Sequence, residues 1–311
     1  MRQHQKGKRS IAALVAWAAA IFTSAAAAAP QPIILEPRTF PESVTSTRDG
    51  TLLIGSTEKG GVYRVVRGVG PVEMWVQADS TNGIGTVFGV LADEAAGLLW
   101  LCSNDLARAG KPPSIKAFDL KTGAYRTSHE LPGGGMCNDM AVDRAGTLYA
   151  TDMGGRILRM TKGAARLEPW ISDPVLRTAD GIVVTRDGRV LVNTFGSGKL
   201  YAVRPARDGA AGPLAEIRPS RPLAQPDGMR LGPDGSIYLV EGAGKADRLV
   251  LSGDTAQVTT LAEGLDGPAG ITLIGRTPWV VEGKAAYRMN PTLRDKDPGA
   301  FRIIPIAGAA K

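Results

Sequence analysis

A repeated pattern of two short β-rich runs separated by a tight turn most constrains how this chain can fold. Clear copies begin at Pro41 (PESVTSTRDGTLLIGS), Cys137 (CNDMAVDRAGTLYATD), Ala179 (ADGIVVTRDGRVLVNT) and Pro226 (PDGMRLGPDGSIYLVE). In each copy an apolar alternation leads into a turn that ends in glycine, and a second β-rich run follows, as in a β-hairpin. Degenerate copies begin at Val87 and Pro268, so six units follow one another at intervals of 42 to 50 residues.

This period is typical of a β-propeller blade with four short strands. A third run follows each hairpin, as in GRILRM (155–160) and GKLYAV (198–203), and a fourth follows in most units. A β-sandwich also uses many short strands, but it would not repeat them so evenly. The sequence therefore predicts an all-β protein, a six-bladed β-propeller with four-stranded blades around a central metal-binding channel, as a single domain over residues 30–311.

Residues 1–29 have the pattern of a secretory signal peptide. A basic start without acids precedes an apolar stretch (11–22) that is too short to span a bilayer, and small residues (25–29) follow. We expect an exported protein, periplasmic or secreted, with no membrane contact after cleavage; the alternative is an uncleaved anchor. Cleavage would lower the formal charge from +7 to +3 and leave no basic cluster interleaved with aromatics. We therefore expect a small-molecule substrate and no nucleic-acid partner.

The residue that opens the first strand of each unit should face the channel. These ring positions are Glu42, Phe88, Asn138, Asp180, Asp227 and Ala269. Three are acids, which would repel one another in a channel of low dielectric unless a cation lay among them, and no Lys, Arg or His stands in the ring. We predict one divalent cation held by Glu42, Asn138, Asp180 and Asp227. All-oxygen ligation favours Ca²⁺, with Mg²⁺, Mn²⁺ or Zn²⁺ as alternatives. A polar ring that hydrates the channel without metal stays open.

The end of the second run in each unit gives a further set of residues. Its members are Ser56, Ser103, Asp152, Thr194, Glu241 and Glu282. Because a hairpin returns its second strand beside the start of the first, we expect these side chains near the metal, as candidates for substrate contact. Solvated strand ends are the alternative interpretation. The aspartates at the hairpin turns lie on the far side and receive no chemical role.

In their order and spacing, these motifs resemble the senescence-marker-protein, gluconolactonase and luciferin-regenerating-enzyme family, which includes regucalcin. The resemblance rests on Glu42, CNDMAVDRAGTLYATDM (137–153), ADGIV (179–183) and PDGM (226–229), and spans nearly all of the mature chain. It implies a six-bladed propeller with one divalent metal on Glu42, Asn138, Asp180 and Asp227. Asp180 stands where the family usually has asparagine, which adds negative charge. Met136 stands where sugar-lactone members have an arginine, so it is a substrate-contact candidate, and an aldonolactone substrate is disfavoured.

A metal-dependent hydrolase of lactones or related esters is the function we expect, with Asp227 as the general base. One alternative is a condensation or lyase enzyme like strictosidine synthase, with Glu241 or Glu282 as the pocket base. Another is a propeller that binds a ligand without catalysis. A Ser-His-Asp hydrolase and a histidine dyad are disfavoured, because the chain has no G-x-S-x-G motif and His129 is the only histidine after residue 29.

The chain has two cysteines, Cys102 and Cys137, in neighbouring units. Each lies one residue before a position expected to face the channel, so side-chain alternation turns both sulfurs away from it. A disulfide between the second and third units is one outcome, provided that the Cα atoms lie within roughly 7 Å. Two buried free thiols are the other. A nucleophilic thiol is disfavoured, because no histidine is placed nearby by the sequence.

Overall fold

The computed structural model describes residues 30–306. The chain divides into two units, Met1–Pro30 and Gln31–Lys311, and the fold described here belongs to the second. The predicted signal peptide, residues 1–29, lies outside the described residues. Within residues 30–306 there is no helix of the length and apolar character that a membrane crossing requires.

Four of the sheets have four strands each. The first contains β2 (Pro41–Ser46), β3 (Leu52–Ser56), β4 (Gly61–Val65) and β5 (Val72–Gln77). The second contains β6 (Thr86–Asp93), β7 (Leu98–Asn104), β8 (Ser114–Asp119) and β9 (Tyr125–Glu130). The third contains β10 (Cys137–Val142), β11 (Leu148–Asp152), β12 (Gly154–Met160) and β13 (Glu168–Arg177). The fourth joins β22 (Pro268–Ile274), β23 (Thr277–Glu282) and β24 (Arg302–Pro305) to β1 (Ile33–Ile34) from the other end of the unit.

A fifth sheet has eight strands and consists of two four-stranded halves. One half contains β14 (Ala179–Val184), β15 (Val190–Thr194), β16 (Lys199–Pro205) and β17 (Ala211–Pro219). The other contains β18 (Pro226–Leu231), β19 (Ile237–Glu241), β20 (Lys245–Ser252) and β21 (Thr255–Glu263). Only two parallel residue pairs, between β17 and β21, join the halves. A short 3₁₀ turn, η1 (Val66–Gly68), and one short helix, α1 (Ala286–Met289), complete the described elements.

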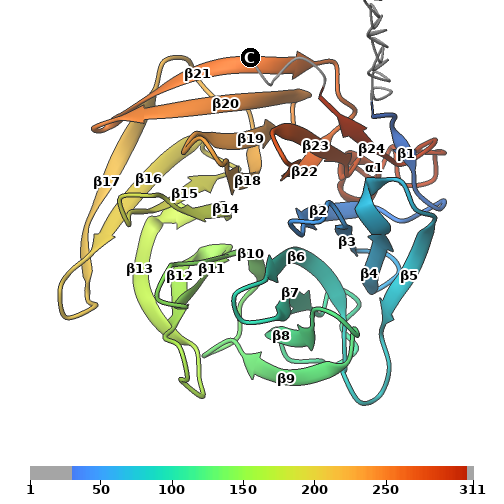
Figure 1. The fold of residues 1–311 in the computed structure, drawn as a ribbon, viewed down its shortest axis with the longest axis horizontal. Helices are drawn as coiled ribbons and strands as arrows, with labels where there is room; N and C mark the ends of the chain where they lie inside the picture. The colour runs from blue at the N-terminus through green and yellow to red at the C-terminus, as the bar shows by residue number, and fades with distance from the viewer. Residues whose placement is uncertain (1–29, 307–311) are drawn as a thin grey trace, which may run out of the picture. The chain divides into compact units, whose positions relative to one another are not determined.

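The sheets stand around a common centre, with the first strand of each four-stranded set innermost (Figure 1). The innermost strands contact one another in a closed order, from β2 to β6, β10, β14, β18 and β22 and back to β2. The prediction of an all-β, propeller-like fold is therefore confirmed. The predicted third runs are also present, as β12 and β16.

Each innermost strand has a break in register at its ring position. The breaks lie between Pro41 and Ser43, Val87 and Val90, Cys137 and Met140, Ala179 and Ile182, Pro226 and Met229, and Pro268 and Gly270. A bulge of this kind re-aims a side chain out of the regular alternation. The glycine that follows Asp227 is required by close packing, since a Cβ at Gly228 would lie 2.7 Å from the carbonyl oxygen of Ala269. The Asp-Gly pair thus combines a channel-facing carboxylate with a close approach of two backbones.

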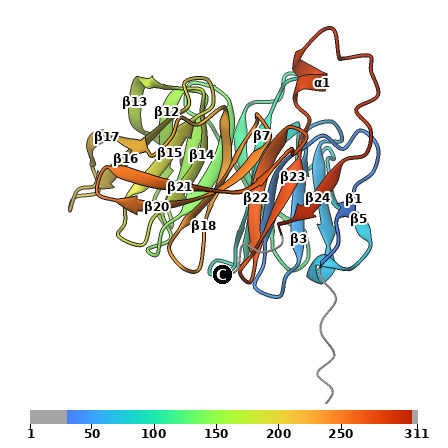
Figure 2. The same cartoon turned by 90° about the horizontal axis from the view of Figure 1, so that it is seen from above.

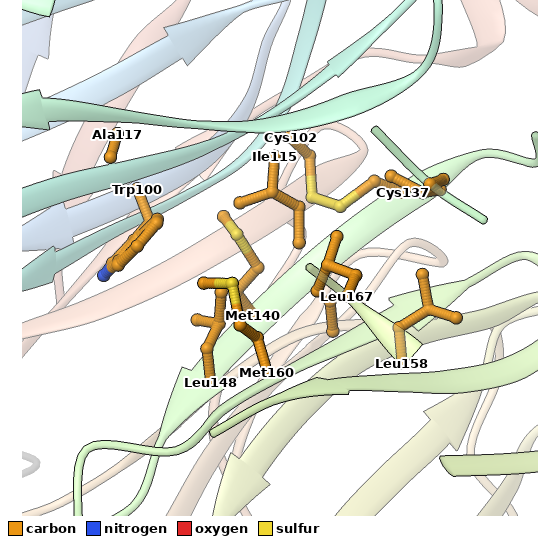
Figure 3. Packing of buried hydrophobic residues seen from close by; sticks show 12 residues of the cluster. Trp100, Cys102, Ile115, Ala117, Cys137, Met140, Leu148, Leu158, Met160 and Leu167 are labelled. Atoms are coloured by element: carbon orange, nitrogen blue, oxygen red, sulfur yellow. A yellow bond between two sulfur atoms is a disulfide. The ribbon is translucent and has the colours of Figure 1, made fainter. Parts of the chain in front are cut away.

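Buried apolar side chains fill the space between neighbouring sheets. One such cluster packs Trp100 and Ile115 of the second sheet against Met140, Leu148 and Leu158 of the third (Figure 3). A disulfide between Cys102 and Cys137 crosses this boundary, with the two Cα atoms 5.3 Å apart. Both cysteines are fully buried. The disulfide therefore joins the two sheets directly beside the ring position of Asn138.

Replacing both cysteines with alanine should lower the free energy of unfolding by about 3 kcal/mol. The bridge links residues 35 positions apart, so its loss returns conformational freedom to the unfolded chain. Urea denaturation of the oxidised wild type and of the Cys102→Ala/Cys137→Ala variant measures the difference. Wild type treated with reductant should unfold close to the variant. An unchanged midpoint in the variant would contradict the expected stabilisation.

Candidate metal centre and active site

The inner ends of the sheets enclose a cavity of about 290 Å³. All six ring residues line it: Glu42, Phe88, Asn138, Asp180, Asp227 and Ala269. The register inferred from the repeat therefore brings one side chain from each innermost strand to the same space. The four oxygen-bearing members come from β2, β10, β14 and β18.

Three of these residues form a compact group of carboxylates. Glu42, Asp180 and Asp227 each offer one oxygen atom, and the three oxygens lie within 4.8 Å of one another. The Nδ2 of Asn138 donates a hydrogen bond to Oδ2 of Asp180 over 3.1 Å. The other oxygen of Asp180, Oδ1, is buried and has no hydrogen-bond partner among residues 30–306. Carboxylate oxygens from three innermost strands thus lie close together. Within the described part of the chain, Oδ1 of Asp180 has no hydrogen bond to offset its burial.

The electrostatics of this group are unfavourable for three free carboxylates. Burial raises the pKa of Glu42 well above its usual value, and the charges of Asp180 and Asp139 add to the rise, while Arg230 opposes it. Burial also raises the pKa of Asp227, with further contributions from Asp180 and Glu42. Burial raises the pKa of Asp180 to about 7, although its interactions with Asp227 and Asn138 oppose the rise. Such a group is stabilised by bound protons or by a cation.

Arg230 is a channel residue that the sequence analysis missed. It lies three residues after Asp227 on β18, and its guanidinium pairs with Asp139 of β10 at 2.6 Å. The same group donates to the carbonyl oxygen of Val90 on β6 (3.0 Å) and to Oγ of Ser43 on β2 (3.3 Å). One side chain therefore connects four innermost strands. The signal in the sequence was a charged residue inside a predicted first strand, three positions after the ring residue.

The charge of Arg230 does not neutralise the ring. Asp139 is only 4% exposed and makes the ion pair with Arg230, whereas no ion pair reaches Glu42, Asp180 or Asp227 among residues 30–306. The ring therefore keeps an excess of negative charge, which is the condition under which a divalent cation binds.

The ring residues fit a hard cation. They supply only carboxylate and amide oxygens, the donors that Ca²⁺ and Mg²⁺ prefer, and no thiol or imidazole lines the cavity. The unpartnered Oδ1 of Asp180 is the kind of buried oxygen that a metal ion would satisfy. Glu42, Asn138, Asp180 and Asp227 are the residues that would hold the ion; among the alternatives named above, Zn²⁺ is the least favoured by this donor set.

The second set of strand-end residues has a different place from the one predicted. Ser103, Asp152, Thr194, Glu241 and Glu282 are each at most 2% exposed, and none of them lines the cavity. Met136 also lies outside the cavity lining, so substrate contact by these six residues stays a prediction.

Most of this set instead anchors the segment that leads into the innermost strand of the same sheet. Glu282 accepts a hydrogen bond from the backbone N–H of Asp266 (2.9 Å), just before β22. Asp152 does the same for Met136 (2.8 Å), just before β10. Ser103 accepts from the N–H of Gly85 (2.9 Å), just before β6. The exception is Thr194, whose hydroxyl bonds Ser197 in the following turn. These side chains hold the ring strands in place from behind the cavity wall.

The two glutamates of this set are also ion-paired. Arg221 pairs with Glu241 at 2.7 Å, and Arg302 pairs with Glu282 at 2.6 Å. Glu241 also accepts a hydrogen bond from the backbone N–H of Ala224. Neither carboxylate is therefore placed to act as a base in the cavity.

The residues that do line the wall lie one position further along the chain. Thr57, Met153, Phe195 and Gly283 each follow a member of the set directly. Other wall residues come from segments that carry no readable motif: Phe40 and Leu106 lie in loops, and Arg288 and Met289 lie in α1. The cavity thus combines a polar ring with a largely apolar wall, an arrangement common in small-molecule sites.

Comparison with known proteins identifies the fold. A family model described as strictosidine synthase-like, N-terminal, matches residues 139–160, and no curated protein matches the sequence significantly. A putative gluconolactonase structure has a TM-score of 0.63 at 14% identity, covering 89% of this chain and 93% of that chain. Luciferin-regenerating enzyme has a TM-score of 0.62 at 11% identity, covering 89% and 96%. Virginiamycin B lyase from Staphylococcus aureus has a TM-score of 0.59 at 17% identity, covering 85% and 80%. The chain thus shares a propeller-like fold with these proteins, and the resemblance drawn from its sequence to the gluconolactonase and luciferin-regenerating-enzyme family fits these neighbours.

Proposed function

We propose that this protein is a divalent-metal-dependent hydrolase of lactones or related esters, exported after removal of residues 1–29. The observation that carries the proposal is the group of carboxylates from Glu42, Asp180 and Asp227, within 4.8 Å of one another, at a cavity of about 290 Å³ with an apolar wall. The shared fold with a putative gluconolactonase supports the reaction class. We also propose six blades, because the halves of the eight-stranded sheet are joined by only two residue pairs.

The ring residues would have separate roles in ester hydrolysis. A bound divalent cation would polarise the substrate carbonyl and stabilise the negative charge that develops on its oxygen. Glu42, Asn138, Asp180 and Asp227 would hold the ion. Asp227 also lines the cavity, and its carboxylate is the group proposed as the general base. In hydrolysis the water oxygen bonds to the acyl carbon, Asp227 takes the water proton, and the bond to the leaving oxygen breaks. Asp227 then returns the proton to that oxygen, which completes the acid and alcohol products.

Metal analysis followed by a panel of lactones and esters tests this function. We expect about one divalent ion per chain, preferably Ca²⁺, in the purified protein. Turnover should be lost after chelation and should return when the ion is restored. Turnover that survives complete removal of the metal would contradict the proposal.

A lyase is the second candidate, because the strictosidine synthase-like match covers residues 139–160 and a lyase shares the fold. The version with Glu241 or Glu282 as the base loses support, since both are buried and ion-paired. A lyase would have to use the ring acids. Reaction in H₂¹⁸O separates the two, because hydrolysis places ¹⁸O in the acid product and elimination does not. A protein that binds ligands from the panel without any turnover would be a binding propeller.

A further inference from the structure

Arg288 is a cation without a partner beside the candidate active site. It belongs to α1, which lies between β23 and β24, and this segment projects beyond the sheets (Figure 2). Its side chain lines the cavity together with the ring acids. Its guanidinium makes no ion pair or side-chain hydrogen bond with any residue in the range 30–306; its close contact is the ring of Phe40, 5.6 Å from centre to guanidinium carbon.

The surroundings of Arg288 leave its charge available to a ligand. It is partly buried; burial lowers its pKa, Glu58 opposes this, and the charge of Arg38 lowers it further. That glutamate is already paired with Arg38 at 2.8 Å. A partly desolvated guanidinium with open donors binds carboxylates and similar anions well, because it offers them a pair of parallel hydrogen bonds.

The remaining wall of the cavity is apolar. Phe88 on β6, Met153 between β11 and β12, and Phe195 directly after β15 line it. Leu106 and Met289 are its more exposed members, at 43% and 72%. Apart from the ring residues and Arg288, Thr57 is the polar side chain of this lining. Such a wall offers few partners to the hydroxyl groups of a sugar, but it favours an aromatic or aliphatic body.

A second cavity of about 430 Å³ adjoins the first, and the two share Thr57, Leu106 and Arg288 in their linings. Lys59 and Lys111 also line this neighbour. Glu58 and Asp105 line it as well, so three basic side chains stand against two acidic ones on the Arg288 side. The charged residues of the ring, in contrast, are all acids.

We propose that the substrate is an ester or lactone with an apolar body and an anionic group, and that Arg288 binds the anion while the acyl group reaches the ring. This inference rests on the proposed function and names the substrate class of the same site. Arg288 is then a specificity-determining residue, which selects carboxylate-bearing substrates over neutral ones of the same shape.

Calorimetry with the metal-loaded protein tests the anion subsite without requiring turnover. The probes are 4-phenylbutyrate and the neutral 4-phenylbutanol. Wild type should bind the anion about tenfold more tightly than the alcohol, the size expected for a charge-assisted contact. Arg288→Gln should abolish this preference. Arg64→Gln is the matched control, because Arg64 also lies over an aromatic ring, that of Trp75 at 4.9 Å, but does not line the cavity; it should keep the preference.

Two results would overturn the inference. One is equal affinity of wild type for the two probes. The other is an anion preference that survives Arg288→Gln, as expected if the carboxylate binds the metal instead. Failure of the proposed function is separate, because it appears as absence of hydrolysis across the panel. Where hydrolysis is found, Arg288→Gln should raise KM for mono(4-nitrophenyl) glutarate about tenfold with little change in kcat.

Discussion

Replacing Arg230 with alanine is expected to lower the free energy of unfolding by about 3–5 kcal/mol. Arg230 is 12% exposed and pairs with Asp139, which is 4% exposed. Removing one partner leaves the other as an uncompensated buried charge, which costs more than the pair contributes. The substitution also removes donors to the carbonyl oxygen of Val90 and to Ser43. Urea denaturation measures the loss.

Two further variants separate the buried charge from simple loss of contacts. The double variant Arg230→Met/Asp139→Leu removes both charges and should recover part of the stability lost in Arg230→Ala. Arg48→Ala breaks an exposed ion pair with Glu94, at 3.4 Å and with the arginine 87% exposed, and should change stability little. A loss below 1 kcal/mol in Arg230→Ala would show that the pair does not stabilise the centre of the ring.

Asp227→Asn is expected to reduce kcat/KM by a factor of about 10³ toward whichever lactone or ester the protein hydrolyses. The substitution removes the general base, a contribution of this order by itself, and takes one negative charge from the ring. The affinity for Ca²⁺ should therefore fall in the same variant. Steady-state kinetics and calorimetric Ca²⁺ titration measure the two effects separately.

Asp234→Asn is the matched control for this experiment. Asp234 is the same residue type in the same hairpin, but it lies at the turn between β18 and β19 and pairs with Arg248 at 2.7 Å. It should keep both turnover and Ca²⁺ affinity. If Asp227→Asn hydrolyses its substrate as fast as wild type, another group is the base.

The repeat predicted the fold and the ring because both depend on local pattern. Hairpin turns and the period near 45 residues specify the strands, and the Asp-Gly pair marks the point where β18 bulges toward the channel. The same register at Glu42, Asn138 and Asp180 placed all of them in one cavity. Side chains that share a structural position in successive units can be aligned without knowing how the units pack.

The parts that were missed depend on contacts between units or on loops. Arg230 and Asp139 lie 91 positions apart in the sequence, and the repeat pattern does not predict that they pair. The strand-end set was expected near the metal because a hairpin returns its second strand beside the start of the first. The backbone instead leaves the strand there, so Met153, not Asp152, reaches the wall. Arg288 lies in a segment that has no counterpart in the other units.

The pairing of β1 with β24 constrains the order in which the parts of this propeller-like fold can form. Ile33 pairs with Ile303 and Ile34 with Arg302, so the sheet that contains both ends of the unit forms only after nearly the whole chain has been synthesised. Glu42 stands on β2, next to that last sheet, and Asp227 stands on β18, on its other side. We expect a nascent chain to fold its early hairpins first, and the circle of innermost strands to close only when β22 stands between β18 and β2. We therefore expect metal binding to occur late in folding, after the six innermost strands have formed their closed ring.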